Sequence, residues 1–166
     1  MSIKVMERLD RIEVLVKSVL DVVDPKDDGK RRFVDRVKMN QLQNLLHDAL
    51  ISTDHVLNCA IIRRKDSSLR ASSVGFHLYG DQIQKFIDAF KDPPRTREEG
   101  LLFENNNYKC VRADKNSIYA KCEKIGLVMV KTHTLLILGT YNENMFPSVC
   151  VEAVEKLADY FKEKGK

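Results

Sequence analysis

The sequence has no long apolar run and only four cysteines among its 166 residues. No run approaches the ~20 residues of a membrane-spanning helix. The N-terminus also lacks the uninterrupted apolar stretch of a secretory signal, because charged residues recur in it every few positions. We therefore expect neither a membrane span nor a secretory signal, and we expect a cytoplasmic protein.

The cysteines form no CxxC pair and show no zinc-ligand spacing. They are Cys59, Cys110, Cys122 and Cys150. Each lies in a strand or helix pattern, where a free cysteine behaves as a small hydrophobic residue. The sequence therefore predicts reduced, structural thiols and no bound metal, as is usual inside the cell.

Signatures of catalysis are missing as well. The four histidines have no cysteine or acidic partner at a recognisable catalytic spacing. There is no glycine-rich phosphate loop, no HExxH and no GxSxG. We predict a protein that is not an enzyme and that needs no cofactor.

The composition that remains is that of a globular domain. Apolar residues make up 43% of the chain, charged residues 31%, and the net charge is +4. This length suffices for one ordinary domain with some chain left over. The mild positive charge permits contact with anionic surfaces and does not require a nucleic-acid partner.

The segment at the N-terminus is predicted to be a helical extension. Within residues 2–23, apolar residues recur at alternating steps of four and three, which is the heptad spacing of a coiled coil. This pattern fits a helix docked on its own domain, and equally a helix that associates with a second copy or a partner. Proline, glycine and dense charge follow at 24–32, so we interpret residues 1–38 as a helical extension and a charged linker.

Residues 39–166 carry the pattern of one α+β domain. The expected helices are 42–50, 81–90 and 147–164, and the expected strands are 56–62, 69–74, 101–103, 108–113, 118–122, 127–130 and 134–138. Asparagine-rich turns are expected at 105–107 and 114–116. Helices at both ends with a meander between them predict an antiparallel sheet with helices packed on its faces.

Basic residues cluster in three places of this domain: residues 63–65, Arg70, and the C-terminal lysines 162, 164 and 166. Such clusters are commonly solvated surface. If they converge in space, they could instead attract anionic lipid headgroups, with each cation contributing about 1 kcal/mol near such a surface.

In their order, spacing and total length, several segments of residues 39–166 resemble the profilin family, in particular its divergent fourth vertebrate branch. The segments are 39–43, 100–103, 131–133, 135–141 and 155–165. The resemblance implies a central antiparallel sheet of about seven strands with the terminal helices packed on one face. It also implies that actin monomers, proline-rich segments and phosphoinositides are the partners to consider. Residues 1–38 lie outside the resemblance, as a genuine extension or an upstream start chosen in error.

Two family sites are altered in this sequence. Profilins stack polyproline on aromatic rings, but the corresponding positions here hold Leu42, Leu45 and Arg70, and only Tyr160 is kept. A glycine and an asparagine near the start of the last helix commonly contact actin, and Ser148 and Val151 occupy those places. We therefore expect weak binding of proline-rich peptides and weakened or lost actin binding.

The function that this sequence indicates is that of a non-enzymatic, cytoskeleton-associated adaptor that binds anionic phospholipids. The expected lipid ligands are Arg64 and Arg70, with Lys162 and Lys166 as outer contacts. Two alternatives stay open. One is an actin-monomer-binding profilin that regulates actin polymerisation, and the other is a structural module that recruits a partner through residues 2–23.

Overall fold

The computed structural model describes residues 40–166, so the interpretation of residues 1–38, including the heptad pattern at 2–23, lies outside the described residues. A helix occupies residues 40–49. It is followed by η1 (Ile51–Thr53), β1 (Cys59–Arg63), β2 (Ser68–Ser72), α3 (Gly80–Asp88), α4 (Pro93–Glu99), β3 (Leu101–Phe103), β4 (Asn106–Ala113), β5 (Ser117–Cys122), β6 (Ile125–Lys131), β7 (Leu135–Tyr141) and α5 (Pro147–Glu163).

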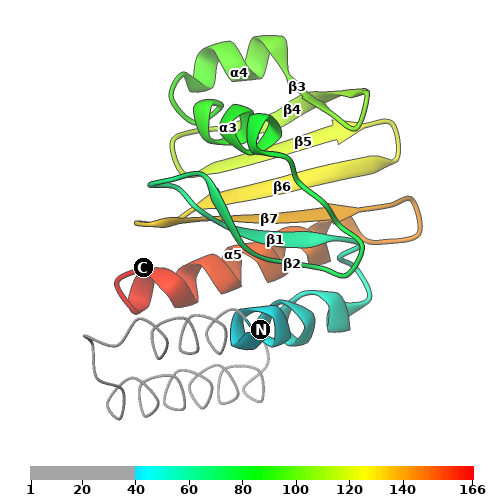
Figure 1. Cartoon of the computed structure of the whole chain (residues 1–166). Coiled ribbons are helices and arrows are strands. Elements are labelled where there is room, and N and C mark those ends of the chain that lie inside the picture. The colour runs from blue at the N-terminus through cyan, green and yellow to red at the C-terminus, as the bar shows by residue number, and fades with distance from the viewer. Residues whose placement is uncertain (1–39) are drawn as a thin grey trace.

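The strands form one antiparallel sheet of seven strands in the order β2-β1-β7-β6-β5-β4-β3. The predicted α+β architecture is thus confirmed (Figure 1). Strands that are consecutive in the chain pair with one another, except β2 and β3, which form the two edges of the sheet. In addition, β7 pairs with β1. This return places β6 and β7 in the middle of the sheet, where both of their faces are buried. That explains why these two strands are almost continuously apolar in sequence.

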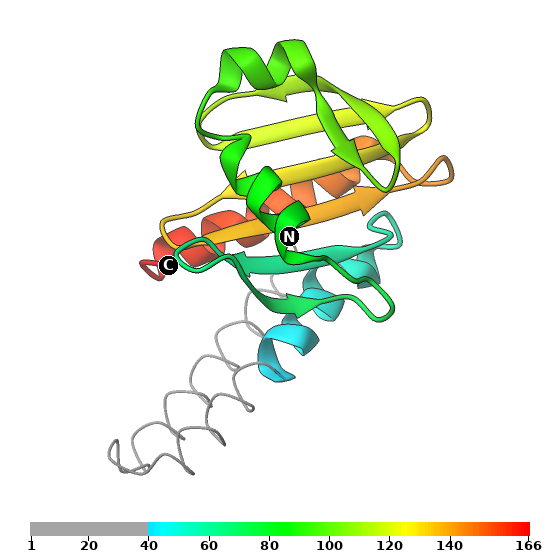
Figure 2. The ribbon, with the colours of Figure 1, turned by 45° about the horizontal axis from the view of Figure 1, so that its top comes forward.

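One face of the sheet packs against the two terminal helices of the domain (Figures 1 and 2). Leu46 and Leu50 from the first helix meet Val154 and Leu157 of α5 in one buried cluster. The helix α5 approaches β7 so closely that a Cβ on Gly139 would lie 2.7 Å from a methyl carbon of Val154. Glycine at this position therefore lets the helix lie directly on the sheet.

The opposite face packs against α3 and α4 and is richer in aromatic rings. Phe103 lies at the centre of this cluster, with ring centroids 5.4 Å from Phe86, 6.1 Å from Phe76 and 6.2 Å from Tyr108. Such tilted and edge-on arrangements are the favourable ones for aromatic pairs. The two faces thus have separate cores.

The helix α4 lies outside the helices expected from the sequence, because the consecutive prolines Pro93 and Pro94 are more typical of a helix end than of a helix start. Proline is tolerated in the first turn of a helix, where its missing N–H would have had no partner. The Asp92 side chain accepts a hydrogen bond from the backbone N–H of Arg95 and caps this helix. The turn expected at 105–107 also lies slightly earlier, since Glu104 and Asn105 adopt positive φ between β3 and β4.

Two strands contain a β-bulge, in which one residue has no partner on the neighbouring strand. In β2 the pairs Ile61–Ala71 and Ile62–Leu69 leave Arg70 unmatched. In β4 the pairs Cys110–Ala120 and Arg112–Tyr119 leave Val111 unmatched. A bulge interrupts the alternation of side chains along a strand, so the sequence alone does not tell on which side Arg70 lies.

Candidate functional site

Three turns meet at one end of the sheet, which we call the basic end. They are residues 64–67 between β1 and β2, residues 114–116 between β4 and β5, and residues 132–134 between β6 and β7. The strand order brings them together, because Arg63 pairs with Leu135 and Ser117 pairs with Val130. The end of α5 reaches the same place in Figure 1.

Arg64 holds the middle of this end together. One terminal nitrogen of its guanidinium, Nη1, donates to the backbone carbonyls of Thr132 at 2.8 Å and His133 at 3.0 Å. The side chain thereby joins the β1–β2 turn to the β6–β7 turn. Its Nε and Nη2 donors have no hydrogen-bond partner among residues 40–166.

The C-terminal residues contact the same turn. The backbone oxygen of Lys166 accepts from the Thr134 amide at 2.7 Å and from the Thr132 hydroxyl at 2.8 Å. Lys162 lies in the last turn of α5, half-buried, with its ammonium 3.9 Å from the Asp159 carboxylate. Arg64 and the backbone of Lys166 thus meet at the turn 132–134. No hydrogen bond or ion pair of residues 40–166 joins Lys162 to that turn, so the binding role of these residues stays a prediction.

No hydrogen bond or ion pair of residues 40–166 joins Arg70 to Arg64, Lys162 or Lys166. It is half-buried at the β2 bulge. Two residues further on, the outer edge of β2 is bonded by Gln43, whose side-chain amide accepts from the Ser72 N–H and donates to the Ser72 carbonyl. Pairing of Arg70 with Arg64 therefore stays a prediction.

A pocket of about 140 Å³ opens beside Arg64 on the face that carries α3. It is lined by Arg64, Ile87, Phe90, Lys91, Lys131 and Leu136. Burial and the neighbouring charges of Arg64 and Lys115 lower the pKa of Lys131. The ammonium of Lys131 lies 5.8 Å from the centroid of the Phe90 ring. Sequence reasoning missed Lys91 and Lys131, because neither is close in sequence to the basic clusters.

The positions of the family's polyproline groove largely coincide in space. Leu45 and Tyr160 belong to one buried cluster, each with 4% of its surface exposed, and Leu42 packs against that cluster. For Arg70, the fourth of these positions, no contact with the other three is found within residues 40–166. Leu42 and Leu45 offer apolar area but no flat aromatic ring on which a proline could stack.

The start of α5 carries the two positions of the altered actin contact. Ser148 is exposed, while Val151 is half-buried against the cluster beneath α5. Just before the helix, the exposed Phe146 ring stacks on His55 with centroids 5.0 Å apart. The backbone N–H of Phe146 donates to Nδ1 of His55 at 3.0 Å, which fastens the start of α5 to the loop before β1.

A polar network beside α5 was also missed. Glu155 accepts hydrogen bonds from the hydroxyls of Ser117 and Tyr119, and it thereby links α5 to β5. Burial, and then the hydrogen bond and charge of Glu155, raise the pKa of Tyr119 to about 12. The guanidinium of Arg112 lies 5.4 Å from the Tyr119 ring and pairs with Asp114 at 2.9 Å. The signal in the sequence would have been the spacing of Ser117 and Tyr119 on one face of a strand.

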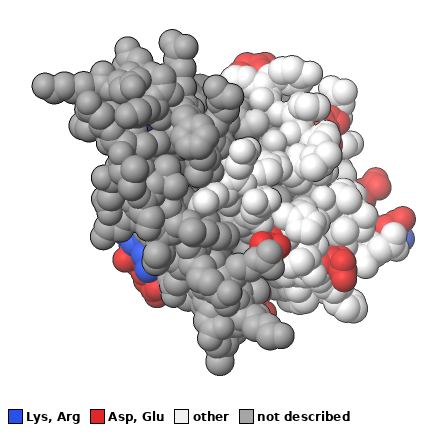
Figure 3. All heavy atoms as spheres, turned by 60° about the horizontal axis from the view of Figure 1, so that its bottom comes forward, with Lys and Arg blue, Asp and Glu red and all other residues white. Residues whose placement is uncertain are grey.

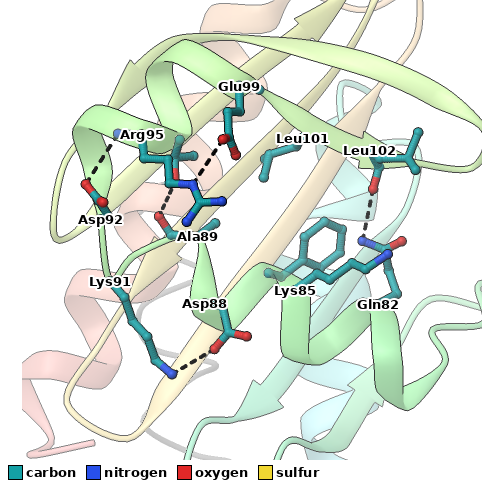
Figure 4. Close-up of a pocket in the computed structure, with 13 residues that line it drawn as sticks. Gln82, Lys85, Asp88, Ala89, Lys91, Asp92, Arg95, Glu99, Leu101 and Leu102 are labelled. Atoms are coloured by element: carbon teal, nitrogen blue, oxygen red, sulfur yellow. Dashed lines mark hydrogen bonds and ion pairs between the residues drawn. The ribbon is translucent and has the colours of Figure 1, made fainter.

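A larger groove of about 620 Å³ lies between α3, α4 and β3 (Figure 4). Four of the six charged side chains that line it form ion pairs. Lys91 lies 2.8 Å from Asp88, and Arg95 lies 3.0 Å from Glu99. This groove has no excess of either charge that would select a ligand.

Residues 40–166 contain no group of three or more histidine, cysteine, aspartate and glutamate side chains arranged to hold a metal ion. Among the same residues, no helix is long and apolar enough to cross a membrane. Cys59 and Cys150 are buried, and burial is the main cause that raises the pKa of each thiol to about 12. Such thiols stay protonated and unreactive at neutral pH.

Comparison with known proteins places these features in a family. The profilin family model matches residues 40–166. Profilin-4 of Bos taurus is 49% identical over 128 residues, which is 76% of this chain and 99% of that protein. Profilin-A of Physarum polycephalum is 36% identical, covering 74% of this chain and 97% of the relative.

Solved structures agree. Profilin II of Acanthamoeba castellanii superposes with a TM-score of 0.69 at 34% identity and covers 75% of this chain and 98% of that one. Schizosaccharomyces pombe profilin gives 0.70 at 31% identity, with the same two shares. Mouse profilin IIa, solved in complex with a double repeat from the FH1 domain of mDia1, gives 0.59 at 17% identity over 72% of this chain and 95% of that one, which supports the fold alone.

A seven-stranded antiparallel sheet that carries both terminal helices on one face, together with these matches, defines a cytoskeletal protein of the actin-regulating, non-enzymatic class. The chain belongs to the profilin family.

Proposed function

We propose that this profilin binds anionic phospholipids at the basic end of its sheet and has a reduced affinity for actin monomers. The observation that carries the lipid proposal is the meeting of Arg64 and Lys166 on the turn 132–134. Arg64 of the β1–β2 turn and the residue that follows the end of α5 therefore meet on one edge of the molecule. The face shown in Figure 3, by contrast, is mainly uncharged with scattered acidic side chains on its described part.

The energetics favour a surface contact of modest strength. Each cation near an anionic membrane contributes about 1 kcal/mol, and salt screens exposed charges over ~8 Å at physiological ionic strength. Arg64 is fixed by two carbonyls and keeps its other donors for phosphate oxygens, so little side-chain freedom is lost when it binds. Several such cations on one edge produce a salt-sensitive attraction.

The test is co-sedimentation of the full chain with phosphatidylcholine vesicles that contain a phosphatidylinositol bisphosphate. Lys162→Gln/Lys166→Gln should pellet less than the native protein, by about tenfold in partition at low salt. The matched control is Lys109→Gln/Lys121→Gln, which removes the same charge from exposed lysines on β4 and β5. Equal losses in both variants, or no pelleting of the native protein, would show that the basic end is ordinary surface.

The reduced actin affinity rests on α5. Ser148 is exposed where the family has glycine, and Val151 turns part of its side chain toward the core where the family has asparagine. In a titration of labelled monomeric actin, we expect Ser148→Gly/Val151→Asn to bind at least tenfold more tightly than the native chain. A native dissociation constant below about 1 μM, roughly −8 kcal/mol, would contradict the proposal.

Proline-rich peptides should bind poorly for a similar reason, since no stacking ring is offered by Leu42, Leu45 and Arg70. Retention of the native chain on a polyproline resin would disprove this. Replacing Leu42 and Arg70 by tryptophan and Leu45 by tyrosine should restore part of the retention.

A further inference from the structure

Ser67 stands in the charge pattern that basophilic serine kinases recognise. These kinases select a serine that follows cations two and three positions earlier, because acidic residues of the kinase pair with those side chains. Arg64 and Lys65 precede Ser67 by three and two positions, and Arg63 comes before them. No other serine of the sequence has a basic residue at both positions. The sequence thus singles out Ser67 among its serines.

Ser67 also lies where an enzyme can reach it. It belongs to the turn 64–67 between β1 and β2, and β2 is an edge strand of the sheet. The residue is partly exposed, and its neighbours Lys65 and Asp66 are exposed. Its hydroxyl donates to Oε1 of Gln84 on α3 at 2.8 Å, at the surface of the domain. The oxygen that would accept a phosphoryl group is therefore not enclosed by the core.

The tip of this hairpin is joined to the sheet by little backbone pairing. Two residue pairs, Ile62–Leu69 and Arg63–Ser68, connect the strands between the turn and the bulge at Arg70. The bulge interrupts the ladder beyond them. Kinases bind the acceptor segment in an extended form, and short edge segments open at far less than the free energy of global unfolding. The step also requires Arg64 to leave the turn 132–134 for the time of the reaction.

The next residue, Ser68, is a poorer acceptor although it is adjacent. Its hydroxyl donates to Oδ1 of Asp66 at 2.7 Å, and its backbone N–H donates to the same oxygen at 3.2 Å. Hydrogen bonds from Arg63 and from Ser68 lower the pKa of the Asp66 carboxyl, so this group stays charged. A carboxylate in contact with the hydroxyl repels an incoming phosphoryl group.

A phosphate on Ser67 would lie beside cations that it can pair with. Arg64 is opposite Ser67 across the turn, since the flanking residues Arg63 and Ser68 pair with each other. Within residues 40–166, no carboxylate forms an ion pair with Arg64 or Lys65. Three cations and one carboxylate give residues 63–67 a charge of +2, which a phosphate of about −2 cancels.

We propose that Ser67 is a phosphorylation site for a basophilic serine kinase, and that its phosphate closes the hairpin tip onto Arg64 and Lys65. The Ser67 hydroxyl oxygen attacks the γ-phosphorus of ATP, and the bond from that phosphorus to the bridging oxygen of ADP breaks. ADP leaves, and the hydroxyl proton passes to the catalytic carboxylate of the kinase. Ser67 then no longer donates to Gln84, so the tip exchanges its contact with α3 for charge-assisted bonds within the turn.

The experiment incubates the full chain with ATP and the catalytic subunit of cAMP-dependent protein kinase, and locates the phosphate by mass spectrometry of proteolytic peptides. One phosphate is expected, on Ser67, and Ser67→Ala should abolish it. Lys65→Gln should slow the modification by about tenfold, the effect of one charge-assisted hydrogen bond. Because Lys65 is exposed, this variant keeps the fold. Lys115→Gln removes the same charge from the neighbouring turn and should leave the rate unchanged.

Three results would overturn the site: no incorporation, incorporation at Ser68 or Ser73 in place of Ser67, or equal slowing by the two lysine variants. Urea denaturation at low salt tests the closing of the tip. The phosphorylated chain should have a higher urea midpoint than the unmodified chain, and the difference should shrink at high salt. A lower midpoint would mean that the lost bond to Gln84 outweighs the new pairs, which overturns the closing.

Co-sedimentation with the vesicles described above adds a readout that rests on the proposed function. Phosphorylation should reduce pelleting at low salt, because it cancels the charge of the tip. Equal pelleting of the two forms would overturn a part of the tip in lipid binding and leave the modification site in place. If neither form pellets while Ser67 accepts phosphate, the lipid function is wrong and the site stands.

Discussion

The two ends of the sheet are built from the same kind of short turn but carry opposite charge. At the basic end, Asp66 and Asp114 are paired with Arg63 and Arg112, which leaves Arg64, Lys65, Lys115 and Lys131 without an acidic partner among residues 40–166. At the other end, which we call the acidic end, Lys124 lies 3.8 Å from Glu143, while Glu104 and Glu123 form no ion pair within the described chain. Within the described residues, folding thus leaves unpaired basic side chains at one end of the sheet and unpaired acidic side chains at the other.

This segregation shows that the net charge of a small antiparallel protein does not predict which charged partners its surfaces can bind. Alternate turns of a meander lie at opposite ends, so residues that alternate in sign along the sequence are sorted in space. Local pairing then removes the minority charge at each end. What remains is an oriented charge distribution that can steer the molecule toward an anionic surface.

The largest expected effect comes from reversing the basic end. Lys65→Glu/Lys131→Glu changes four unit charges, and at about 1 kcal/mol each the partition onto phosphoinositide vesicles should fall by several hundredfold. Co-sedimentation at low and at physiological salt measures this. Lys109→Glu/Lys121→Glu has the same net charge, and a loss of similar size there would mean that total charge, not its position, controls binding.

The difference between the poles also shows what sequence can predict. The core could be predicted from the apolar runs of β6 and β7 and from the periodicity of α5. Such runs and stripes have to be buried whatever the strand order is. Asp114 was correctly expected in a turn, where its side chain accepts from the N–H groups of Asn116 and Ser117. Such features depend on neighbours in sequence.

The functional surface depends on residues far apart in sequence and was only partly predictable. Arg64 was predicted, but its contacts with Thr132 and His133 span nearly seventy residues and left no local pattern. The bulge at Arg70 interrupts the alternation on which its predicted position relied. Lys91 and Lys131 appear in the sequence as isolated charges. Their meeting is a consequence of the strand order.

A smaller effect is expected when the acidic end is made basic. Glu123→Lys/Glu143→Lys should increase vesicle binding by about tenfold at low salt, because new cations attract any anionic surface. The gain should disappear at physiological salt. It should show no preference for phosphoinositide over phosphatidylserine, since the acidic end has no arginine held in place as Arg64 is. The neutral variant Glu123→Gln/Glu143→Gln is the control, because it removes the repulsion between these carboxylates and the vesicle without adding an attractive charge. A gain with headgroup preference would contradict the role proposed for Arg64.

Arg64 also stabilises its end of the sheet. Arg64→Lys keeps the charge but cannot reproduce both bonds to the turn 132–134, so the free energy of unfolding should fall by about 1 kcal/mol. Urea denaturation measures the loss. Arg95→Lys on α4 is the matched control, because its exposed pair with Glu99 contributes little. Equal effects in the two variants would mean that the carbonyl contacts do not hold the turns together.

The smallest effect concerns the repulsion within the basic end. Burial, and then Arg64 and Lys115, lower the pKa of Lys131 below its ordinary value of 10.5. A base with a lowered folded-state pKa binds fewer protons in the folded state than in the unfolded state, so stability increases as pH rises through the folded-state pKa toward 10.5. Below that range the charged ammonium destabilises the fold.

Lys131→Met should therefore stabilise the protein at neutral pH, by about 0.5 kcal/mol once solvent screening is allowed for. The methionine keeps an apolar stem against Phe90, so packing is preserved. The gain should vanish above pH ~10.5, where lysine is neutral in both states. Paired urea denaturation curves at neutral and alkaline pH measure it, with Lys121→Met as the control on exposed β5. A gain that persists at alkaline pH would come from packing, and not from relief of the repulsion between Lys131 and its neighbouring cations.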